Sequence, residues 1–109
     1  IAIMEIGARM GGDFIGSDLV QLSTGYDFVR GVIEVALGEF NEPVSSDKCH
    51  SGVYFLSAET ALVAAYIKDS KQYPEIVQAD QTDTELHHVT CSAERSGYFI
   101  YQAKKKFEL

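Results

Sequence analysis

Cysteine is scarce in this sequence, with two residues in 109, and so few exclude a disulfide-rich scaffold. Basic residues are also few, because nine Lys and Arg against sixteen Asp and Glu give a formal net charge of −7. An acidic chain is a poor candidate for binding nucleic acid, where affinity comes from basic residues that displace counterions. No segment approaches the roughly 20 apolar residues of a membrane-spanning helix. We therefore expect neither a nucleic-acid partner nor a membrane partner.

The sequence also opens without an initiator Met and without a secretory signal. It begins with the apolar run Ile1–Met4, which Glu5 interrupts, and no basic region precedes that run. Cys49 and Cys91 are then expected to be reduced thiols, and the protein to be cytoplasmic. A chain that starts inside what reads as a strand is expected to be a piece of a longer protein.

The residues that are present predict a folded α+β protein. Hydrophobic residues make up 46% of the chain, which is too many for a disordered one. The length alone suggests one domain, but the pattern of the sequence changes near its middle, where Pro43 and several Ser residues indicate a linker. We predict a helical part over 1–41, a linker over 42–50 and a small β-rich domain over 51–109.

The first part is predicted to contain a strand, a glycine loop and two helices. Ile1–Ile6 is an apolar run of strand length. The following Gly7–Gly16 has too many glycines for a stable helix. Ser17 is suited to the N-cap of a short helix that ends near Ser23, before Gly25.

The second helix is predicted over Phe28–Leu37. Asp27 is a good N-cap, and Gly38 lies where a left-handed residue usually ends a helix. Apolar residues recur at helical spacing and predict a wide apolar face. Arg30 and Glu34 are four residues apart and can form an ion pair on the other side.

The second part is predicted to be mostly strands. Gly52–Leu56, Glu75–Ala79 and Gly97–Ala103 are rich in β-branched or aromatic residues, and the polar Gln81–Glu85 reads as a loop. Ala61–Ile67 is ambiguous, because its alanines favour a helix while its length also allows a buried strand.

The candidate site lies at the end of the first predicted strand. A carboxylate at Glu5, at the mouth of a glycine loop, can bind a hard cation such as Mg²⁺. Arg9 is suited to bind a carboxylate or phosphate group with two hydrogen bonds. Gly11 and Gly12 would let backbone N–H groups approach the same anion. The alternative is a simple surface ion pair between Glu5 and Arg9 across a turn.

Two other clusters are weaker candidates. Five residues carry zinc-type ligands, but they lack the close pairs of a zinc site and read better as ordinary strand and loop residues; they are Cys49, His50, His87, His88 and Cys91. The basic run Lys104–Lys106 is expected to solvate the end of the chain.

Three ordered motifs resemble the C-terminal lobe of the ATP-grasp superfamily. They are Met4–Asp13 (MEIGARMGGD), Leu22–Val29 (LSTGYDFV) and Leu37–Glu39 (LGE), and they lie within about the first forty residues. Gly52–Leu56 and Ser92–Ile100 resemble, less specifically, the small C-terminal domain of carboxylate–amine ligases similar to L-amino-acid ligases.

The resemblance implies an ATP-dependent ligase that joins a small carboxylate to an amine through an acyl phosphate. It implies that Glu5 binds Mg²⁺, that Arg9 acts catalytically by neutralising the phosphate or substrate carboxylate, and that Arg9, Gly11 and Gly12 contact the cofactor ATP. Gly7 stands where the family usually has a metal-binding Asn, which weakens the case for a second Mg²⁺.

The resemblance also implies that this chain is incomplete as an enzyme. The glycine-rich lid and the ATP-binding lysines would belong to the remainder of its parent chain, so the chain alone should not turn over ATP. In that setting Ala61–Ile67 would be a strand paired with the one before it. A free-standing α+β module that binds a small anion, or a structural cap, remains the alternative, and unpaired edges at Ile1–Ile6 leave a homodimer open.

Overall fold

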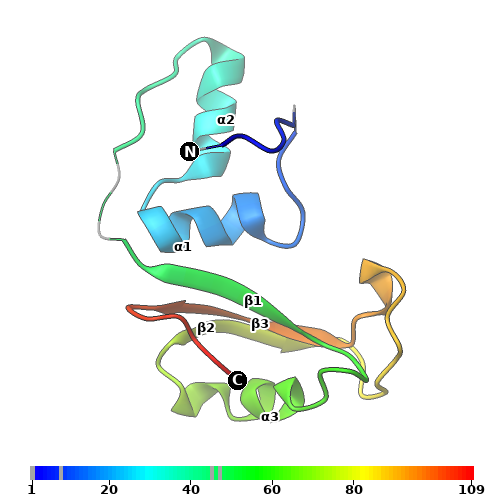
Figure 1. Cartoon of the computed structure of the whole chain (residues 1–109). Helices are drawn as coiled ribbons and strands as arrows, with labels where there is room; N and C mark the ends of the chain where they lie inside the picture. The colour runs from blue at the N-terminus through cyan, green and yellow to red at the C-terminus, as the bar shows by residue number, and fades with distance from the viewer. Residues whose placement is uncertain (1, 8, 45, 47) are drawn as a thin grey trace.

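The computed structural model describes residues 2–7, 9–44, 46 and 48–109. Helices combine with a small antiparallel sheet, so the predicted α+β class is confirmed (Figure 1). In chain order the elements are η1 (Ile15–Leu19), α1 (Val20–Thr24), α2 (Phe28–Leu37), β1 (His50–Leu56), α3 (Val63–Lys68), η2 (Ser70–Gln72), β2 (Ile76–Gln81), η3 (Ser92–Glu94) and β3 (Gly97–Ala103).

The sheet has the strand order β1-β3-β2, and both pairings are antiparallel. The three strands predicted from the second part of the sequence are confirmed, β3 with the bounds expected for it. In the register of β1 and β3, Tyr54 lies opposite Phe99 and Leu56 lies opposite Gly97. Alternate residues of each strand therefore face opposite sides of the sheet.

One face of the sheet carries the hydrophobic core. Leu56 and Phe99 on the strands pack with Val63 and Ile67 of α3, and all four are buried. Phe107 folds back beneath the same face, where its carbonyl oxygen accepts a 2.9 Å hydrogen bond from the Tyr54 hydroxyl. Apolar burial therefore concentrates between the sheet and α3.

The prediction of a strand over Ala61–Ile67 is wrong. The segment contains most of α3, and its two buried residues, Val63 and Ile67, are spaced four apart on one side of that helix. Such spacing buries one helical face, and the alanines between them favour the helix. The place beside β1 that the resemblance assigned to this segment is taken by β3.

The opposite face of the sheet is covered by η1 and α1 (Figure 1). The Ser51 hydroxyl donates to the carbonyl of Leu19 at 2.7 Å, and the Gln102 side-chain amide donates to the carbonyl of Leu22 at 2.6 Å. These two bonds join β1 and β3 to the helical part of the chain. They fix where the glycine-rich loop, which precedes η1, meets the sheet.

No strand forms at the predicted Ile1–Ile6, as far as the described residues 2–6 reach; Ile1 lies outside them. A strand needs a neighbour with which to share backbone hydrogen bonds, and β1, β2 and β3 pair among themselves. Ile3, Met4 and Ile6 are 75%, 98% and 83% exposed.

Helix formation also begins earlier than the sequence suggested. The carbonyl of Phe14 accepts hydrogen bonds from the N–H groups of Asp18 and Leu19, at 2.9 and 3.0 Å. Ser17 thus lies inside η1 rather than at an N-cap, and its hydroxyl bonds the Asp18 side chain instead. The left-handed Gly25, with φ 77°, ends α1 as expected.

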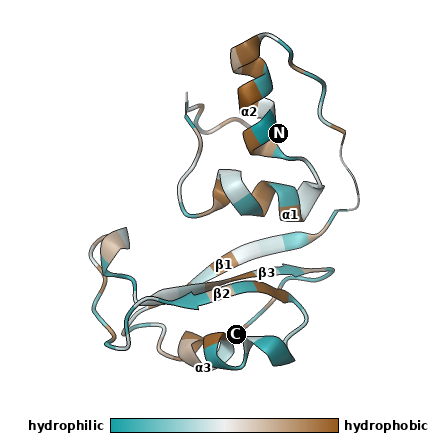
Figure 2. Ribbon diagram, turned by 180° about the vertical axis from the view of Figure 1, so that it is seen from behind, coloured by the Kyte–Doolittle hydropathy of each residue, from teal (hydrophilic) through white to brown (hydrophobic). Residues whose placement is uncertain are grey.

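The second helix is confirmed with its predicted bounds. The Asp27 carboxylate accepts a hydrogen bond from the Arg30 N–H at 2.9 Å, and Gly38 ends the helix with φ 71°. Arg30 Nε also bonds Glu34 at 2.8 Å. Figure 2 colours much of α2 as hydrophobic. Val32, Ile33, Val35 and Leu37 of this helix are nevertheless exposed.

Candidate functional site

The structure does not join the two charged residues of the predicted site. Glu5 is exposed and has no hydrogen bond or ion pair with any described residue. Arg9 is also exposed, and its Nη1 donates to the carbonyl of Met10 at 3.2 Å. The simple ion pair between Glu5 and Arg9 is therefore absent from the described residues, and most donors of the Arg9 guanidinium remain available.

The glycines of the loop differ in their surroundings. A Cβ built at Gly7 or Gly12 would meet no atom within 4 Å, whereas one at Gly11 would lie 3.2 Å from the Ile15 side chain. The Gly12 carbonyl accepts a hydrogen bond from the Ile15 N–H at 3.1 Å. Open space thus surrounds Gly7 and Gly12, whereas Gly11 packs against Ile15 of η1.

Two consecutive non-glycine residues follow the loop in the left-handed conformation. Asp13 has φ 53° and Phe14 has φ 66°. This region costs roughly 1–2 kcal/mol for a bulky residue such as Phe14, whereas Asp is among the residues that tolerate it. Strain of this kind persists only where the surroundings hold it, and it concentrates at functional sites.

The surroundings of Asp13 include a guanidinium from the far end of the chain. Arg95 Nη1 lies 2.6 Å from Asp13 Oδ1, and Nη2 lies 3.3 Å from Oδ2. The Arg95 guanidinium carbon also lies 3.7 Å from the centre of the Phe55 ring. The Asp13 carboxylate and the face of the Phe55 ring together fix the plane of the Arg95 guanidinium. The Arg95 side chain is only 23% exposed.

Phe14 completes this group of residues. Its ring centre lies 4.5 Å from that of Tyr98 and 6.3 Å from that of Phe55. The side chains surround a cavity of about 300 Å³, to which Thr82 and Ser92 also contribute. We call Asp13, Phe14, Phe55, Arg95 and Tyr98 the Arg95 cluster.

The sequence alone did not reveal the Arg95 cluster. Asp13 and Arg95 are 82 positions apart, and no local spacing rule connects residues so distant. The one available signal was the resemblance over Ser92–Ile100, which contains Arg95 but gave it no role. The pairing depends on η1 lying across the sheet face that carries Phe55 and Tyr98.

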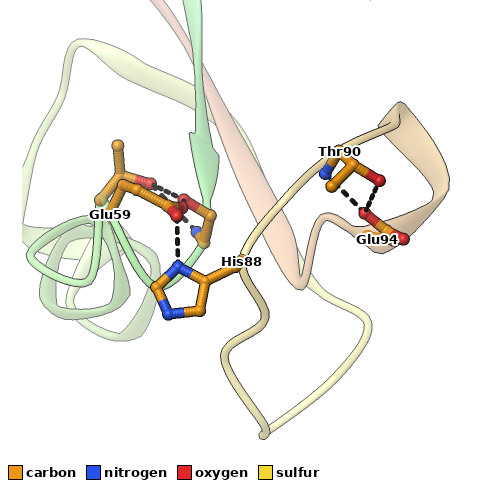
Figure 3. Close-up of polar contacts among 6 residues, drawn as sticks. Glu59, His88, Thr90 and Glu94 are labelled. Carbon is orange, nitrogen blue, oxygen red and sulfur yellow. Dashed lines mark hydrogen bonds and ion pairs between the residues drawn. The ribbon is translucent and has the colours of Figure 1, made fainter.

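A second polar group lies near one end of the sheet (Figure 3). His88 Nδ1 approaches Glu59 Oε1 at 2.6 Å, and the buried Ser57 donates its hydroxyl to the other Glu59 oxygen at 2.8 Å. These donors, His88 foremost, lower the pKa of Glu59 to about 2. Glu59 therefore remains ionised through the whole neutral range.

The segment that carries His88 is held by two further carboxylates. Glu94 accepts hydrogen bonds from the backbone N–H and the hydroxyl of Thr90, at 2.6 and 2.9 Å, and these bonds lower its pKa (Figure 3). Asp83 lies 3.1 Å from His87 Nε2, and its carboxylate raises the pKa of His87. Both pairs lie within 82–95 and shape this loop.

His87 and His88 thus each pair with a carboxylate. Among the residues that the structure describes, no group of three or more His, Cys, Asp or Glu is placed to hold a metal ion. Cys49 and Cys91 are free thiols. The basic run Lys104–Lys106 instead borders a surface cavity of about 600 Å³ beside Phe107.

Neither protein-family models, nor curated proteins, nor solved structures give a match to this chain. Any assignment of function therefore depends on the motifs and on the geometry described above. Within the described ranges, no helix is both long enough and apolar enough to span a bilayer.

Proposed function

We propose that this chain is the C-terminal part of an ATP-dependent carboxylate–amine ligase of the ATP-grasp superfamily, acting through an acyl phosphate. The observation that carries the proposal is the order and spacing of the motifs at Met4–Asp13, Leu22–Val29 and Leu37–Glu39. The cap at Asp27 and the left-handed Gly38 support it, because the resembling motifs place a helix start and a helix end at these residues.

Glu5 is proposed to bind Mg²⁺. Its exposed carboxylate forms no hydrogen bond or ion pair with other described residues, and carboxylate oxygens are the ligands that Mg²⁺ prefers. When bound, the ion supplies positive charge against the phosphate oxygens. Gly7 offers no side chain to a second ion, although the open space around it would admit one. The residues therefore fit a single carboxylate contact to the metal.

Arg9 is proposed to bind the phosphate that is transferred, or the substrate carboxylate. Only a backbone carbonyl occupies its guanidinium among the described residues, and the remaining N–H groups can form paired bonds with an oxyanion. Backbone N–H groups at Gly11 and Gly12 lie beside it in the chain and would contact the same phosphates of ATP. These donors would stabilise negative charge as the acyl phosphate forms.

Exposed apolar surfaces support the remainder of the parent chain as a partner. Ile3, Met4 and Ile6 are exposed, as are Val35 and Leu37 on α2. Exposed apolar residues that gather on one part of a protein mark a surface that another chain or segment covers. The free thiols of the chain support a cytoplasmic location for the ligase.

The complete gene product that contains this chain provides the test. Phosphate release from ATP, dependent on Mg²⁺, a carboxylate and an amine, should be lost in Glu5→Gln. Arg9→Ala should lower kcat by about 10²-fold, the typical effect of removing one charge-stabilising donor, with little change in thermal stability because Arg9 is exposed.

Two variants serve as matched controls for these substitutions. Glu42→Gln removes an exposed carboxylate outside all three motifs, and Arg30→Ala removes a guanidinium from α2. Both should retain activity. Full activity in Glu5→Gln or in Arg9→Ala would contradict the roles proposed for these residues.

A further inference from the structure

We propose that Arg95 is a positioning residue for the glycine-rich loop: through Asp13 it fixes the direction of the loop and so the placement of Arg9. This inference rests on the proposed function of Arg9. Arg95 itself contacts Asp13 and Phe55 rather than the loop glycines. Its effect on the reaction would therefore be indirect. It would act through the glycine-rich loop, where its partner Asp13 lies 82 positions earlier in the sequence.

Arg95 is itself held in place by its surroundings. It directly precedes Ser96, which is fully buried and donates hydrogen bonds from its N–H to the Leu56 carbonyl and from its hydroxyl to the Glu85 carbonyl, at 2.9 and 2.6 Å. The guanidinium then stacks on Phe55 of β1. Arg95 is thus a fixed point on the sheet, and not a mobile surface cation.

The turn at Asp13 and Phe14 needs such a fixed point. Both residues have positive φ, a conformation that Asp tolerates but that a residue with a bulky ring, such as Phe14, avoids. The carboxylate is held by Arg95, and the ring of Phe14 is held by Tyr98. Loss of the Arg95 contact would leave Phe14 as the main restraint on a backbone turn that is unfavourable by itself.

A short, packed segment of the chain connects Asp13 to Arg9. Gly12 precedes Asp13 directly and bonds Ile15 through its carbonyl. Met10 packs beside Gly16, where a Cβ would lie 3.3 Å from the Met10 sulfur. Both ends of the segment 10–16 are therefore fixed around the Asp13 turn, and Arg9 is the next residue outward. A change in the turn would displace the Arg9 side chain, and a displacement of about 1 Å can cost about 10²-fold in rate.

The competing reading is a surface ion pair with no effect beyond itself, since many exposed pairs contribute little. Hydrogen exchange of this chain, followed by mass spectrometry, separates the two readings. In Arg95→Ala and in Asp13→Asn, the amides of Ile15, Asp18 and Leu19, which donate to the carbonyls of Gly12 and Phe14, should exchange about tenfold faster, because local opening of the turn becomes easier. Asn tolerates the left-handed conformation, so Asp13→Asn isolates the ion pair from the backbone preference.

The control for exchange is Arg30→Ala, which removes another paired guanidinium without touching the loop. It should leave exchange at Ile15, Asp18 and Leu19 unchanged, and amides of β3 should stay protected in all three variants. Unchanged exchange at these three amides in both Arg95→Ala and Asp13→Asn would overturn the proposal.

Kinetics of the complete gene product test the consequence for Arg9. Arg95→Ala should lower kcat by about tenfold or more, with the KM for the amine unchanged, because only the charge-stabilising group has moved. Arg95→Lys should restore part of kcat, since it keeps the charge but not the paired bonds. The double variant Asp13→Asn/Arg95→Ala should be no slower than the slower single variant.

A strictly additive double variant, or a change in stability with kcat intact, would overturn the positioning role. Absence of ligase activity in the unsubstituted gene product would instead remove the proposed function, and the positioning role with it. The exchange measurement would still decide whether Arg95 holds the loop, so the two failures are distinguishable.

Discussion

Three carboxylates near one end of the sheet are held in their ionised form by donors on neighbouring residues. Hydrogen bonds lower the pKa of Glu59, of Asp83 and of Glu94. A lowered pKa stabilises the fold above the ordinary carboxyl pKa, and this contribution is lost as the pH falls through that range toward the folded value. His87 has the opposite sign, because its raised pKa contributes fully below about 6.5 and is lost as the pH rises through the folded value.

His88→Ala provides a test at this scale. The Glu59 pKa should rise from about 2 toward the ordinary value of 4.5 for a Glu side chain, because His88 is the largest cause of the lowering. The rise should be incomplete, since the Ser57 hydroxyl still donates to the carboxylate. Carboxyl chemical shifts recorded by NMR against pH measure it. His50→Ala should leave the Glu59 titration unchanged, and a pKa near 2 in His88→Ala would contradict the assignment.

Among the elements, the packing of β1 against β3 depends on one glycine. A Cβ at Gly52 would lie 2.6 Å from Cε1 and 2.8 Å from Cζ of Tyr101, whose ring is buried in the core. The ring is rigid and surrounded, so it can move only by disturbing its neighbours. The close packing of Tyr101 over its register partner Gly52 therefore leaves no room for a side chain at position 52.

Gly52→Ala should therefore destabilise the protein by about 1–3 kcal/mol, the usual cost of overpacking a core. Urea unfolding followed by far-ultraviolet circular dichroism measures the change. Gly7→Ala is the matched control, since its Cβ would meet no atom within 4 Å, and its effect should stay within about 0.5 kcal/mol. Equal stability of the two variants would show that the Tyr101 ring yields without cost.

The helices and strands show which parts of the fold could be predicted from local sequence patterns. The helix at Phe28–Leu37 was predictable because its cap, its stop and its apolar spacing all lie within twelve residues. The helix within Ala61–Ile67 was not predictable, because a short apolar run is compatible with a helix and with a buried strand. Its packing under the sheet determines which of the two forms. Residues 2–6 have strand composition but lie beside none of the three strands.

Across the whole molecule, burial is uneven. The buried hydrophobic residues that the structure describes all belong to the sequence range from Leu56 to Tyr101, whereas Val32, Ile33 and Leu37 of α2 are exposed. The residues of the candidate site also differ, in whether the sequence alone could point to them. Glu5 and Arg9 could be proposed from the sequence because their motif is local, but Arg95 could not, because its contact with Asp13 exists only once η1 lies on the sheet.

Two leucine substitutions test this difference in burial. Leu56→Ala should cost about 2–5 kcal/mol, because it leaves a cavity at a fully buried position. Leu37→Ala, on the exposed face of α2, should stay within about 0.5 kcal/mol. Thermal or urea unfolding of this chain compares them. A large loss of stability in Leu37→Ala would show that α2 packs against a surface in solution, contrary to its exposure here.

The placement of the aromatic residues also determines what optical measurements can detect. The chain has six tyrosines and no tryptophan, and Tyr26 is the one tyrosine that precedes the sheet. The others include Tyr54, Tyr66 and Tyr101, whose rings stack with Phe99 or Phe107 in the core. Tyrosine emission and near-ultraviolet dichroism thus report mainly on the sheet and α3. Of the six tyrosines, Tyr26 alone reports on α2, because its ring lies against Gly31 of that helix. A single sharp optical transition would therefore describe chiefly the half of the protein that contains the sheet.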